Sequence, residues 1–167
     1  MTSTTLPTHA TTTMETPIGR LTLTARGGLL AGLYMEEHTH APELPGPQEQ
    51  GHQGFEEAIA QIEAYFTGAL KRFDLPLSLN GTGFQKQVWA GLLEIPYGET
   101  VSYGELAQMV GKPGAARAVG LANGRNPVSI IVPCHRVIGA NGGLVGYGGG
   151  LDRKIWLLQH EATHRWD

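Results

Sequence analysis

The period of the hydrophobic pattern changes near Thr82, and this change limits the folds that the 167-residue chain can adopt. Before it, apolar and polar residues alternate, as in LTLTA at 21–25, which is the period of a half-buried strand. After it, apolar residues recur at helical spacing, as over 84–92. The change predicts a small α/β domain over residues 12–81 and a mostly helical domain over 82–167.

The first domain is expected to combine a small antiparallel sheet with one helix. Residues 15–35 predict three strands separated by two turns, one of them at a Gly-Gly pair. A polar loop rich in Pro and Gly at 36–54 leads to a helix over 55–69, and the alternation at 73–79 predicts a further strand. The Thr-rich residues 1–11 are expected to form a flexible tail.

The second domain is expected to be a winged helix-turn-helix. Thr82 and Ser102 each precede a Gln or Glu by three residues, which is a capping box that opens a helix. A Gly-rich turn at 111–114 and a short helix at 115–123 then complete a helix-turn-helix. The Asn-Gly pair at 141–142 lies between apolar flanks and predicts a hairpin, which would be the wing.

Charge is unevenly distributed along the chain. The net charge is −3, yet no acidic residue lies between Glu105 and Asp152. That stretch carries the cations Lys112, Arg117, Arg125 and Arg136. A segment this long without a carboxylate predicts a surface that faces an anion, the alternative being chance in a Gly/Ala-rich segment.

The composition favours a cytoplasmic protein without a membrane partner. The N-terminus, MTSTTLPTHATTT, has no basic start and no apolar stretch, so no signal peptide is expected. The sequence contains no run of about 18 apolar residues, so no membrane span is expected. One cysteine cannot form an internal disulfide, and with scattered histidines it lacks the spacing of a zinc site, so no metal is expected.

Cys134, the single cysteine, lies in the sequence IIVPCHRVIG. A free cysteine can simply be a small buried hydrophobic residue. Pro133 stiffens the backbone before it, however, and His135 and Arg136 follow it, which would lower the pKa of the thiol from about 8.5 toward neutral. Cys134 is therefore predicted to be a nucleophile.

The sequence around Cys134 resembles the active site of the O6-alkylguanine-DNA alkyltransferases, also called methylated-DNA–protein-cysteine methyltransferases. The likeness extends in order through IPYGETVSYGELA (95–107), GAARAVGLANGRNP (114–127), PCHRV (133–137), GYGGG (146–150) and a final predicted helix (151–161). The N-terminal half matches only in outline. The resemblance implies a ribonuclease-H-like α/β domain, followed by a mostly α winged helix-turn-helix domain that carries the active site.

The resemblance implies direct-reversal DNA repair without a cofactor. Such a protein binds double-stranded DNA through the minor groove as a monomer, extrudes the damaged base and transfers an alkyl group from O6 of guanine, or O4 of thymine, to its cysteine. The product is a thioether, which no residue of this chain could hydrolyse. Each molecule would therefore react once.

The resemblance also implies roles for individual residues near the cysteine. Cys134 would accept the alkyl group, His135 would be the base that reaches it through a water, and Glu161 would orient that histidine. Asn126 would hold the turn between the second helix and the cysteine segment. Tyr103 would hydrogen-bond to the flipped guanine and crowd its phosphate.

The DNA contacts are implied to come from the second helix. Arg117 would fill the gap that the flipped base leaves, and Arg125 would also contact DNA. Small residues would allow the helix backbone to approach the groove: Ala115, Ala116, Ala118 and Gly120. Backbone groups near Cys134 and Val137 would read the edge of the base. The pocket around the base would be completed by Tyr147, Gly148 and Gly149.

Two other functions remain open on the sequence. A cysteine hydrolase or acyltransferase could use Cys134 and His135, although this leaves the helix-turn-helix unexplained. A non-catalytic winged-helix protein that binds alkylated DNA is the second alternative, and the presence of Cys134 argues against it.

Overall fold

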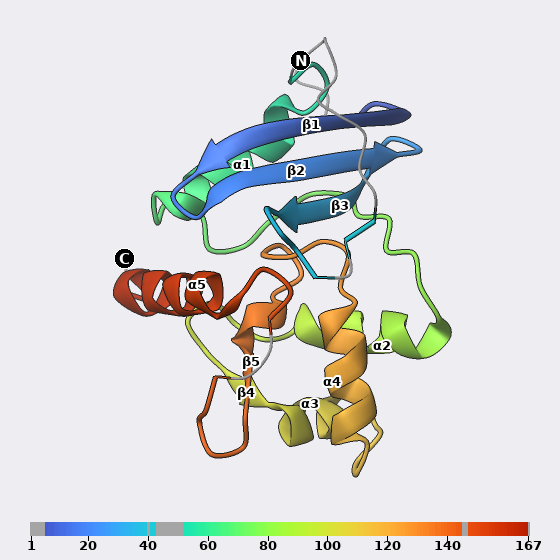
Figure 1. Cartoon of the computed structure of the whole chain (residues 1–167), viewed down its shortest axis with the longest axis vertical. Helices are drawn as coiled ribbons and strands as arrows, with labels where there is room; N and C mark the ends of the chain where they lie inside the picture. The colour runs from blue at the N-terminus through green and yellow to red at the C-terminus, as the bar shows by residue number, and fades with distance from the viewer. Residues whose placement is uncertain (1–5, 40, 43–51, 145–146, 167) are drawn as a thin grey trace.

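The computed structural model describes residues 6–39, 41–42, 52–144 and 147–166. Two domains lie one above the other (Figure 1), a three-stranded sheet with a helix behind it and a group of helices below it. The last helix, α5 (Leu151–His164), lies at the junction under the sheet (Figure 1). Within the described parts of the chain, no helix is long and apolar enough to cross a membrane.

The N-terminal sheet is antiparallel, in the order β1 (His9–Thr16), β2 (Gly19–Arg26) and β3 (Leu29–Met35). Leu21 and Leu23 are fully buried, whereas the threonines beside them are half-buried, because successive side chains of a strand point to opposite faces. The helix α1 (Glu56–Phe66) buries its own apolar face, including Ile59 and Ile62, behind this sheet. The predicted small sheet with one helix is confirmed.

The predicted flexible tail over 1–11 is wrong for its second half. β1 begins at His9, and Leu6 is buried at 5% exposure. The Leu6 N–H also donates to the Gly28 carbonyl at 3.2 Å, next to the turn between β2 and β3. A Thr-rich segment suits a strand because β-branched side chains pack well on a pleated surface. Residues 1–5 lie outside the described part of the chain.

Residues 73–79 run beside β3 but do not form the predicted further strand. Leu30 makes a single bridge with Leu77, in which the Leu30 N–H donates to the Pro76 carbonyl at 3.0 Å and the Ser78 N–H donates to the Leu30 carbonyl at 2.9 Å. Pro76 has no N–H to donate, so the ladder cannot extend through it.

The C-terminal domain contains four α-helices in the described residues: α2 (Gly83–Leu92), α3 (Tyr103–Met109), α4 (Ala116–Gly124) and α5. Both predicted capping boxes are confirmed, with the Gln85 N–H donating to the Thr82 hydroxyl at 3.1 Å and the Glu105 N–H donating to the Ser102 hydroxyl at 3.0 Å. Gly114, in the turn between α3 and α4, has a φ of 86°, which a residue without Cβ adopts readily. The helix-turn-helix is therefore present as predicted.

The segment predicted to be a wing differs from a β-hairpin in the residues that the structure describes. The Asn-Gly turn forms, and the Gly139 N–H donates to the Gly143 carbonyl at 2.8 Å. The strand before the turn, β5 (Val137–Ile138), pairs in parallel with β4 (Val101–Ser102). Because α3 follows β4 directly, this pairing ties the cysteine segment to the start of α3. Residues 145–146 lie outside the description.

The N-terminal sheet also supports the chain just before the cysteine. The Leu33 N–H of β3 donates to the Pro127 carbonyl at 2.9 Å, and Leu33 forms an isolated bridge with Val128. Val128 is fully buried in a hydrophobic core that includes residues of both domains. The sheet therefore fixes one end of the segment that leads to Cys134.

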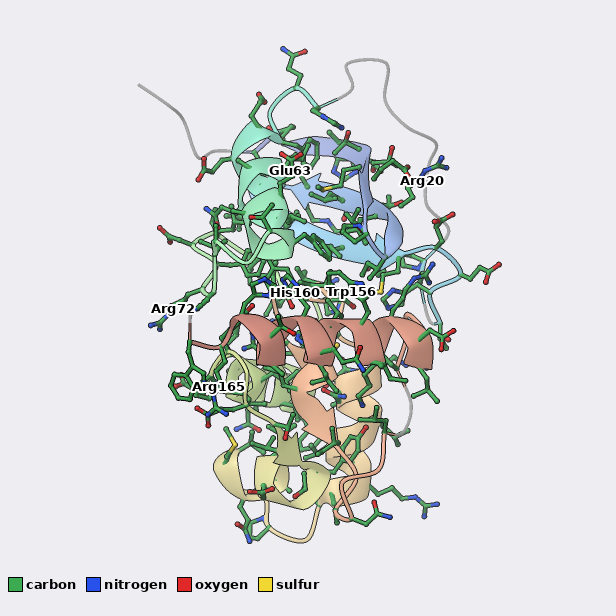
Figure 2. All side chains as sticks on the ribbon, turned by 90° about the vertical axis from the view of Figure 1, so that its left-hand side faces the viewer. Arg20, Glu63, Arg72, Trp156, His160 and Arg165 are labelled. Carbon is green, nitrogen blue, oxygen red and sulfur yellow. The ribbon has the colours of Figure 1, made fainter. Side chains whose placement is uncertain are left out.

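The helix α5 connects the two domains through aromatic side chains. Trp156 and His160 lie on the side of α5 that faces the N-terminal domain (Figure 2). Their rings stack with a centroid separation of 4.8 Å, and Phe66 of α1 packs against Trp156 at 5.5 Å. The opposite side of α5 therefore remains for the cysteine segment.

Candidate active site

Cys134 begins a single 3-10 turn, η1 (Cys134–Arg136), directly after Pro133. Its exposure is 5%, and its N–H donates to the Val132 carbonyl at 2.8 Å. Pro133 has no N–H and a restricted φ, so the turn starts at the cysteine and not before it. The Cys134 carbonyl accepts a hydrogen bond from the Asn123 side chain at 3.5 Å. The backbone thus holds the thiol at one place.

The thiol of Cys134 borders a cavity of about 290 Å³. The lining residues that the sequence predicts are Tyr103, Gly120, Asn126, Tyr147 and Gly148. The lining residues that it does not predict are His38, Thr39, Asn123, Gly124 and Ser129. Their polar groups are mostly neutral hydroxyls and amides, and Asn123 Oδ1 is buried without a hydrogen-bond partner in the described residues. Such a cavity suits an uncharged planar group with donors at its edge.

Val137 and Gly149, two further predicted pocket residues, are not among the residues that line this cavity. Val137 is fully buried, its N–H donates to the Cys134 carbonyl, and its own carbonyl accepts from Lys154 Nζ at 2.7 Å. Gly149 is also buried, and a Cβ at its position would lie 3.1 Å from the Tyr147 ring. Both residues therefore support the cavity from behind.

His38 and Thr39 bring the N-terminal domain to the cavity. The Thr39 N–H donates to the Gly148 carbonyl at 2.7 Å, and the Met35 N–H donates to His38 Nδ1 at 3.0 Å. These residues lie in the polar segment after β3, where no motif marks them. Only the contact between the domains reveals that they belong to the site.

Asn126 is buried and closes the loop between α4 and the cysteine segment. Its Nδ2 donates to the Val132 carbonyl at 2.7 Å, and its Oδ1 accepts from the Val128 N–H at 3.0 Å. The side chain thus replaces two backbone partners that the irregular loop would otherwise lack. This geometry places Val132, and hence Cys134, at a set distance from the end of α4.

Tyr103, the first residue of α3, lies against α4 at the mouth of the cavity. A Cβ on Gly120 would lie 3.4 Å from the Tyr103 ring, so a small residue at position 120 lets the ring lie close to the helix. Burial, and after it the nearby Cys134, raises the pKa of the Tyr103 hydroxyl. The phenol is therefore a neutral donor near neutral pH.

His135 is fully buried, with its Nε2 2.7 Å from Oε2 of Glu161. An ionised carboxylate only accepts hydrogen bonds, so Nε2 carries the proton of the neutral ring. Nδ1 is then an acceptor, and it has no hydrogen-bond partner among the described residues. The Glu161 carboxylate thereby selects the tautomer that leaves Nδ1 basic.

Arg136 does not lie beside the thiol, in contrast to the expectation that it would stabilise a thiolate. Its Nε donates to Glu161 Oε1 at 2.8 Å and its Nη2 donates to Oε2 at 3.0 Å. Its Nη1 donates to the Ile95 carbonyl at 2.7 Å. Because the side chain is buried, Arg136 also does not contribute to the cationic surface that the sequence predicts.

The charges around Glu161 determine the protonation of the pair. Burial opposes the charge of Glu161, but His135 and Arg136 outweigh burial and hold the pKa of the carboxyl well below its usual range. Burial lowers the pKa of His135 more than Glu161 raises it, and Arg136 and Lys154 lower it further. At neutral pH the site therefore contains a carboxylate and a neutral imidazole.

The pKa of Cys134 is raised, which corrects the expected shift toward neutral. Burial is the main cause, and hydrogen bonding from Asn126 and Ser129 and the charge of Lys154 offset only part of it. A buried thiolate without water loses more solvation than these groups return. The resting group is therefore a thiol, which must lose its proton during the reaction.

Lys154 is a further site residue that the sequence reasoning missed. It lies on α5, is fully buried, and its pKa is lowered by burial and raised in part by Cys134. Its place in the last helix, three residues after an exposed Leu151, resembles that of any solvated lysine. A buried lysine near a buried thiol supplies the cation that the sequence assigns to Arg136.

One face of α4 is exposed and carries cations. Its exposed residues are Arg117, Ala118, Leu121, Gly124 and the C-cap residue Arg125. Ala115 and Ala116, also predicted to contact DNA, are half-buried, and Gly120 faces the cavity. Lys112, in the preceding turn, is exposed as well. The described residues contain no group of three His, Cys, Asp or Glu side chains that could hold a metal.

Comparison with known proteins relates both domains to one family. The DNA-binding domain of 6-O-methylguanine DNA methyltransferase matches residues 83–163, and the ribonuclease-like domain matches residues 10–79. The methylated-DNA–protein-cysteine methyltransferase of Mycobacterium leprae is 58% identical over 149 residues, 89% of each chain. That of Methanosarcina acetivorans is 52% identical, over 89% of this chain and 96% of its own.

A solved structure supports the same relationship. The crystal structure of Mycobacterium tuberculosis OGT in complex with DNA superposes with a TM-score of 0.85 at 53% identity, covering 92% of this chain and 93% of that chain. These matches confirm the predicted fold class, a ribonuclease-like domain with a small antiparallel sheet followed by a helical domain.

Proposed function

The chain belongs to the 6-O-methylguanine DNA methyltransferase family, and we propose that Cys134 accepts the alkyl group from O6 of guanine, or O4 of thymine, in DNA. Transfer from methylated DNA to a protein cysteine is the activity that the relatives are named for. One observation carries the proposal. Cys134 lines a cavity, and the next residue, His135, has its Nε2 hydrogen-bonded to the buried carboxylate of Glu161.

His135 is the proposed base. Its Nδ1 takes the proton of Cys134 through one bridging water, while Nε2 keeps its own proton toward Glu161. The carboxylate stabilises the imidazolium that forms, as it does in other nucleophile–histidine–carboxylate sites. A raised thiol pKa is compatible with this step, because the proton leaves as the sulfur attacks.

The transfer itself exchanges an alkyl group for a proton. The sulfur forms a bond to the alkyl carbon while the bond from that carbon to the base oxygen breaks, and the electron pair of that bond goes to the guanine. The Tyr103 hydroxyl donates a hydrogen bond to the departing base and supports its negative charge. The proton held by His135 returns to the guanine, so the products are a thioether and a neutral base.

Double-stranded DNA is the proposed partner, bound in its minor groove by α4 of a single protein molecule. The exposed face of α4 combines cations with small residues, which suits a narrow groove lined by phosphates. Extruding a base costs a few kcal/mol, and Arg117 near the start of α4 has the length to fill the gap in the stack. Arg125 at the other end of the helix adds a phosphate contact.

The proposed reaction is stoichiometric and requires no cofactor, because the DNA supplies the alkyl group. The test is mass spectrometry of the protein after mixing with duplex DNA that contains one O6-methylguanine. A permanent gain of one methyl group on Cys134 in each molecule supports the proposal. Repeated turnover without a mass change would indicate a hydrolase, and binding without a mass change would indicate a damage-binding protein.

A further inference from the structure

We propose that Tyr65, on α1 of the N-terminal domain, is a positioning residue for the pair of Glu161 and His135. The N-terminal domain would then act on the chemistry directly, through one hydroxyl group. This inference rests on the proposed function, since it concerns the base of the proposed transfer.

The Tyr65 hydroxyl donates to Glu161 Oε2 at 2.7 Å, across 96 positions of sequence. The same oxygen lies 2.7 Å from His135 Nε2 and 3.0 Å from Arg136 Nη2. The other oxygen, Oε1, accepts from Arg136 Nε at 2.8 Å and from the Gly98 N–H at 3.2 Å. Among the described residues, every donor to the carboxylate except Tyr65 comes from the C-terminal domain. Tyr65 therefore shares its acceptor atom with the proposed base.

Tyr65 is held in place along its whole length. Its side chain is fully buried, and its ring packs against those of Phe66 and Phe73, at centroid distances of 5.3 and 5.5 Å. Its carbonyl lies 2.7 Å from His160 Nε2. His160 and Glu161 are consecutive residues of α5, so α5 contacts both the backbone and the hydroxyl of Tyr65. Figure 2 shows His160 on the side of α5 toward the N-terminal domain.

The hydroxyl acts on the carboxylate in two ways. It fixes the rotation of the carboxylate, so that Oε2 stays aligned with the imidazole N–H. It also takes part of the negative charge of Oε2, which leaves less charge to stabilise a proton on His135. Burial, and then the charge of Glu161, raises the pKa of Tyr65 well above its usual range. The phenol therefore donates at every pH at which the protein would work.

The direction in which the pKa of His135 changes when the Tyr65 hydroxyl is removed can be predicted. The charged groups around His135 are Glu161 and Lys154 on α5 and Arg136 on η1. Without the Tyr65 hydroxyl, Glu161 Oε2 would interact more strongly with His135, so the pKa of His135 should rise. The base would then lose its proton only at higher pH, and its alignment would be less well fixed.

The experiment compares Tyr65→Phe with the unsubstituted protein in single-turnover transfer from O6-methylguanine duplex across pH 5 to 9. We expect the rate at neutral pH to fall about tenfold, less than the roughly hundredfold loss that a 1 Å misplacement can cause, and the acid limb of the pH profile to move to higher pH. NMR titration of His135 should show its pKa raised in the variant. In a Glu161→Gln background, adding Tyr65→Phe should have no further effect on the rate.

Ile59→Val is the matched control, because Ile59 is also buried on α1 but lies six residues before Tyr65, away from the aromatic contacts that hold the Tyr65 ring. This variant should lower the melting temperature but leave the pH profile and the rate of the folded protein unchanged. If Tyr65→Phe does not fold, the hydroxyl proton of Tyr65 in the unsubstituted protein is observed by NMR, where we expect a slowly exchanging resonance that shifts in Glu161→Gln.

The outcomes separate the two hypotheses. If the unsubstituted protein acquires no alkyl group, the proposed function is wrong. If it reacts, but Tyr65→Phe keeps its rate and acid limb or Ile59→Val shows the same changes, only the role of Tyr65 is wrong. Absence of the hydroxyl resonance, or its insensitivity to Glu161→Gln, would also overturn that role.

Discussion

Lys154 Nζ donates to the Val137 carbonyl at 2.7 Å, and this bond places a buried ammonium group behind the thiol of Cys134. The charge of Lys154 lowers the pKa of Cys134, which burial raises, and Cys134 in turn raises the pKa of Lys154. One hydrogen bond thus supports the backbone of the cysteine segment. It also brings a counter-charge close to the thiolate that forms when Cys134 loses its proton during transfer.

Replacing Lys154 should therefore slow the transfer more than it unfolds the protein. Lys154→Met removes the cation, raises the pKa of Cys134 and leaves the Val137 carbonyl without its donor. We expect the single-turnover rate at neutral pH to fall by about tenfold or more, since one pKa unit is about 1.4 kcal/mol, with partial recovery at higher pH. Lys86→Met, at an exposed lysine of α2, is the control and should react normally. A normal rate for Lys154→Met would show that its charge does not act on the sulfur.

Cys134→Ser should bind DNA but not accept an alkyl group. A serine hydroxyl fits the site but is almost never ionised near neutral pH, and an uncharged hydroxyl is a poor nucleophile for an sp3 carbon. Mass spectrometry measures the transfer, and gel shift measures the binding to duplex with O6-methylguanine. Efficient transfer by the serine variant would contradict the mechanism through the sulfur.

Arg117→Ala should impair the repair of duplex DNA while the fold survives, because Arg117 is exposed. Extruding a base costs a few kcal/mol, so loss of the residue that fills the gap should slow duplex repair by about tenfold or more. The same lesion in single-stranded DNA should be repaired nearly as fast as by the unsubstituted protein. Lys86→Ala, at an exposed cation on α2, is the control. Equal losses on both substrates would exclude a gap-filling role.

Acid should destabilise the protein through Glu161 and His135. The pKa of each is lower in the folded state than in the unfolded chain. Stability from His135 is therefore present above about pH 6.5 and lost as pH falls below it, and stability from Glu161 is lost below about pH 4.3. Glu161→Gln leaves Arg136 without a counter-charge, so it should lower the free energy of unfolding by about 3–5 kcal/mol. Below about pH 4.3, the stability of this variant should depend less on pH than that of the unsubstituted protein. Urea unfolding at several pH values measures both effects.

Alkylation of Cys134 should make the protein less stable and weaken its hold on DNA. The thiol borders the cavity but is buried at 5% exposure beside the turn that Asn126 closes, so a methyl group fixed on the sulfur would press on that turn. Overpacking costs about 1–3 kcal/mol, and the strain should fall on the segment between α4 and β5. The melting temperature and the affinity for repaired duplex are measured before and after one equivalent of substrate. Cys134→Ser treated in the same way is the control, and unchanged melting of the reacted protein would mean that the cavity has spare room.

Several local features of the fold could be predicted from neighbouring residues. The capping boxes join groups only three residues apart, so Thr82 and Ser102 mark the starts of α2 and α3 without any tertiary information. The alternation at 21–25 likewise indicates which side chains of β2 are buried. Cys134 could be identified because its chemistry and its position after Pro133 are properties of the sequence alone.

Neighbourhood in sequence was misleading where a side chain is long or the backbone lacks a donor. Arg136 lies two positions after Cys134, but its guanidinium group extends to Glu161, 25 positions away. Residues 73–79 alternate like a strand, yet Pro76 limits their pairing with Leu30 to a single bridge. In both cases the sequence indicates what kind of interaction the segment can make. Which residue it pairs with is decided by the tertiary fold.

The order of residues along the chain thus specifies the elements of both domains and the identity of the nucleophile, because helix caps, strand alternation and thiol chemistry depend on a few adjacent groups. The packing of the two domains specifies the state of the nucleophile and its supporting groups. Tyr65 meets Glu161 only because α1 lies over α5, and the pKa of Cys134 rises only because the fold removes water from it. Desolvation and charge interactions depend on distances in space, which the linear sequence does not contain.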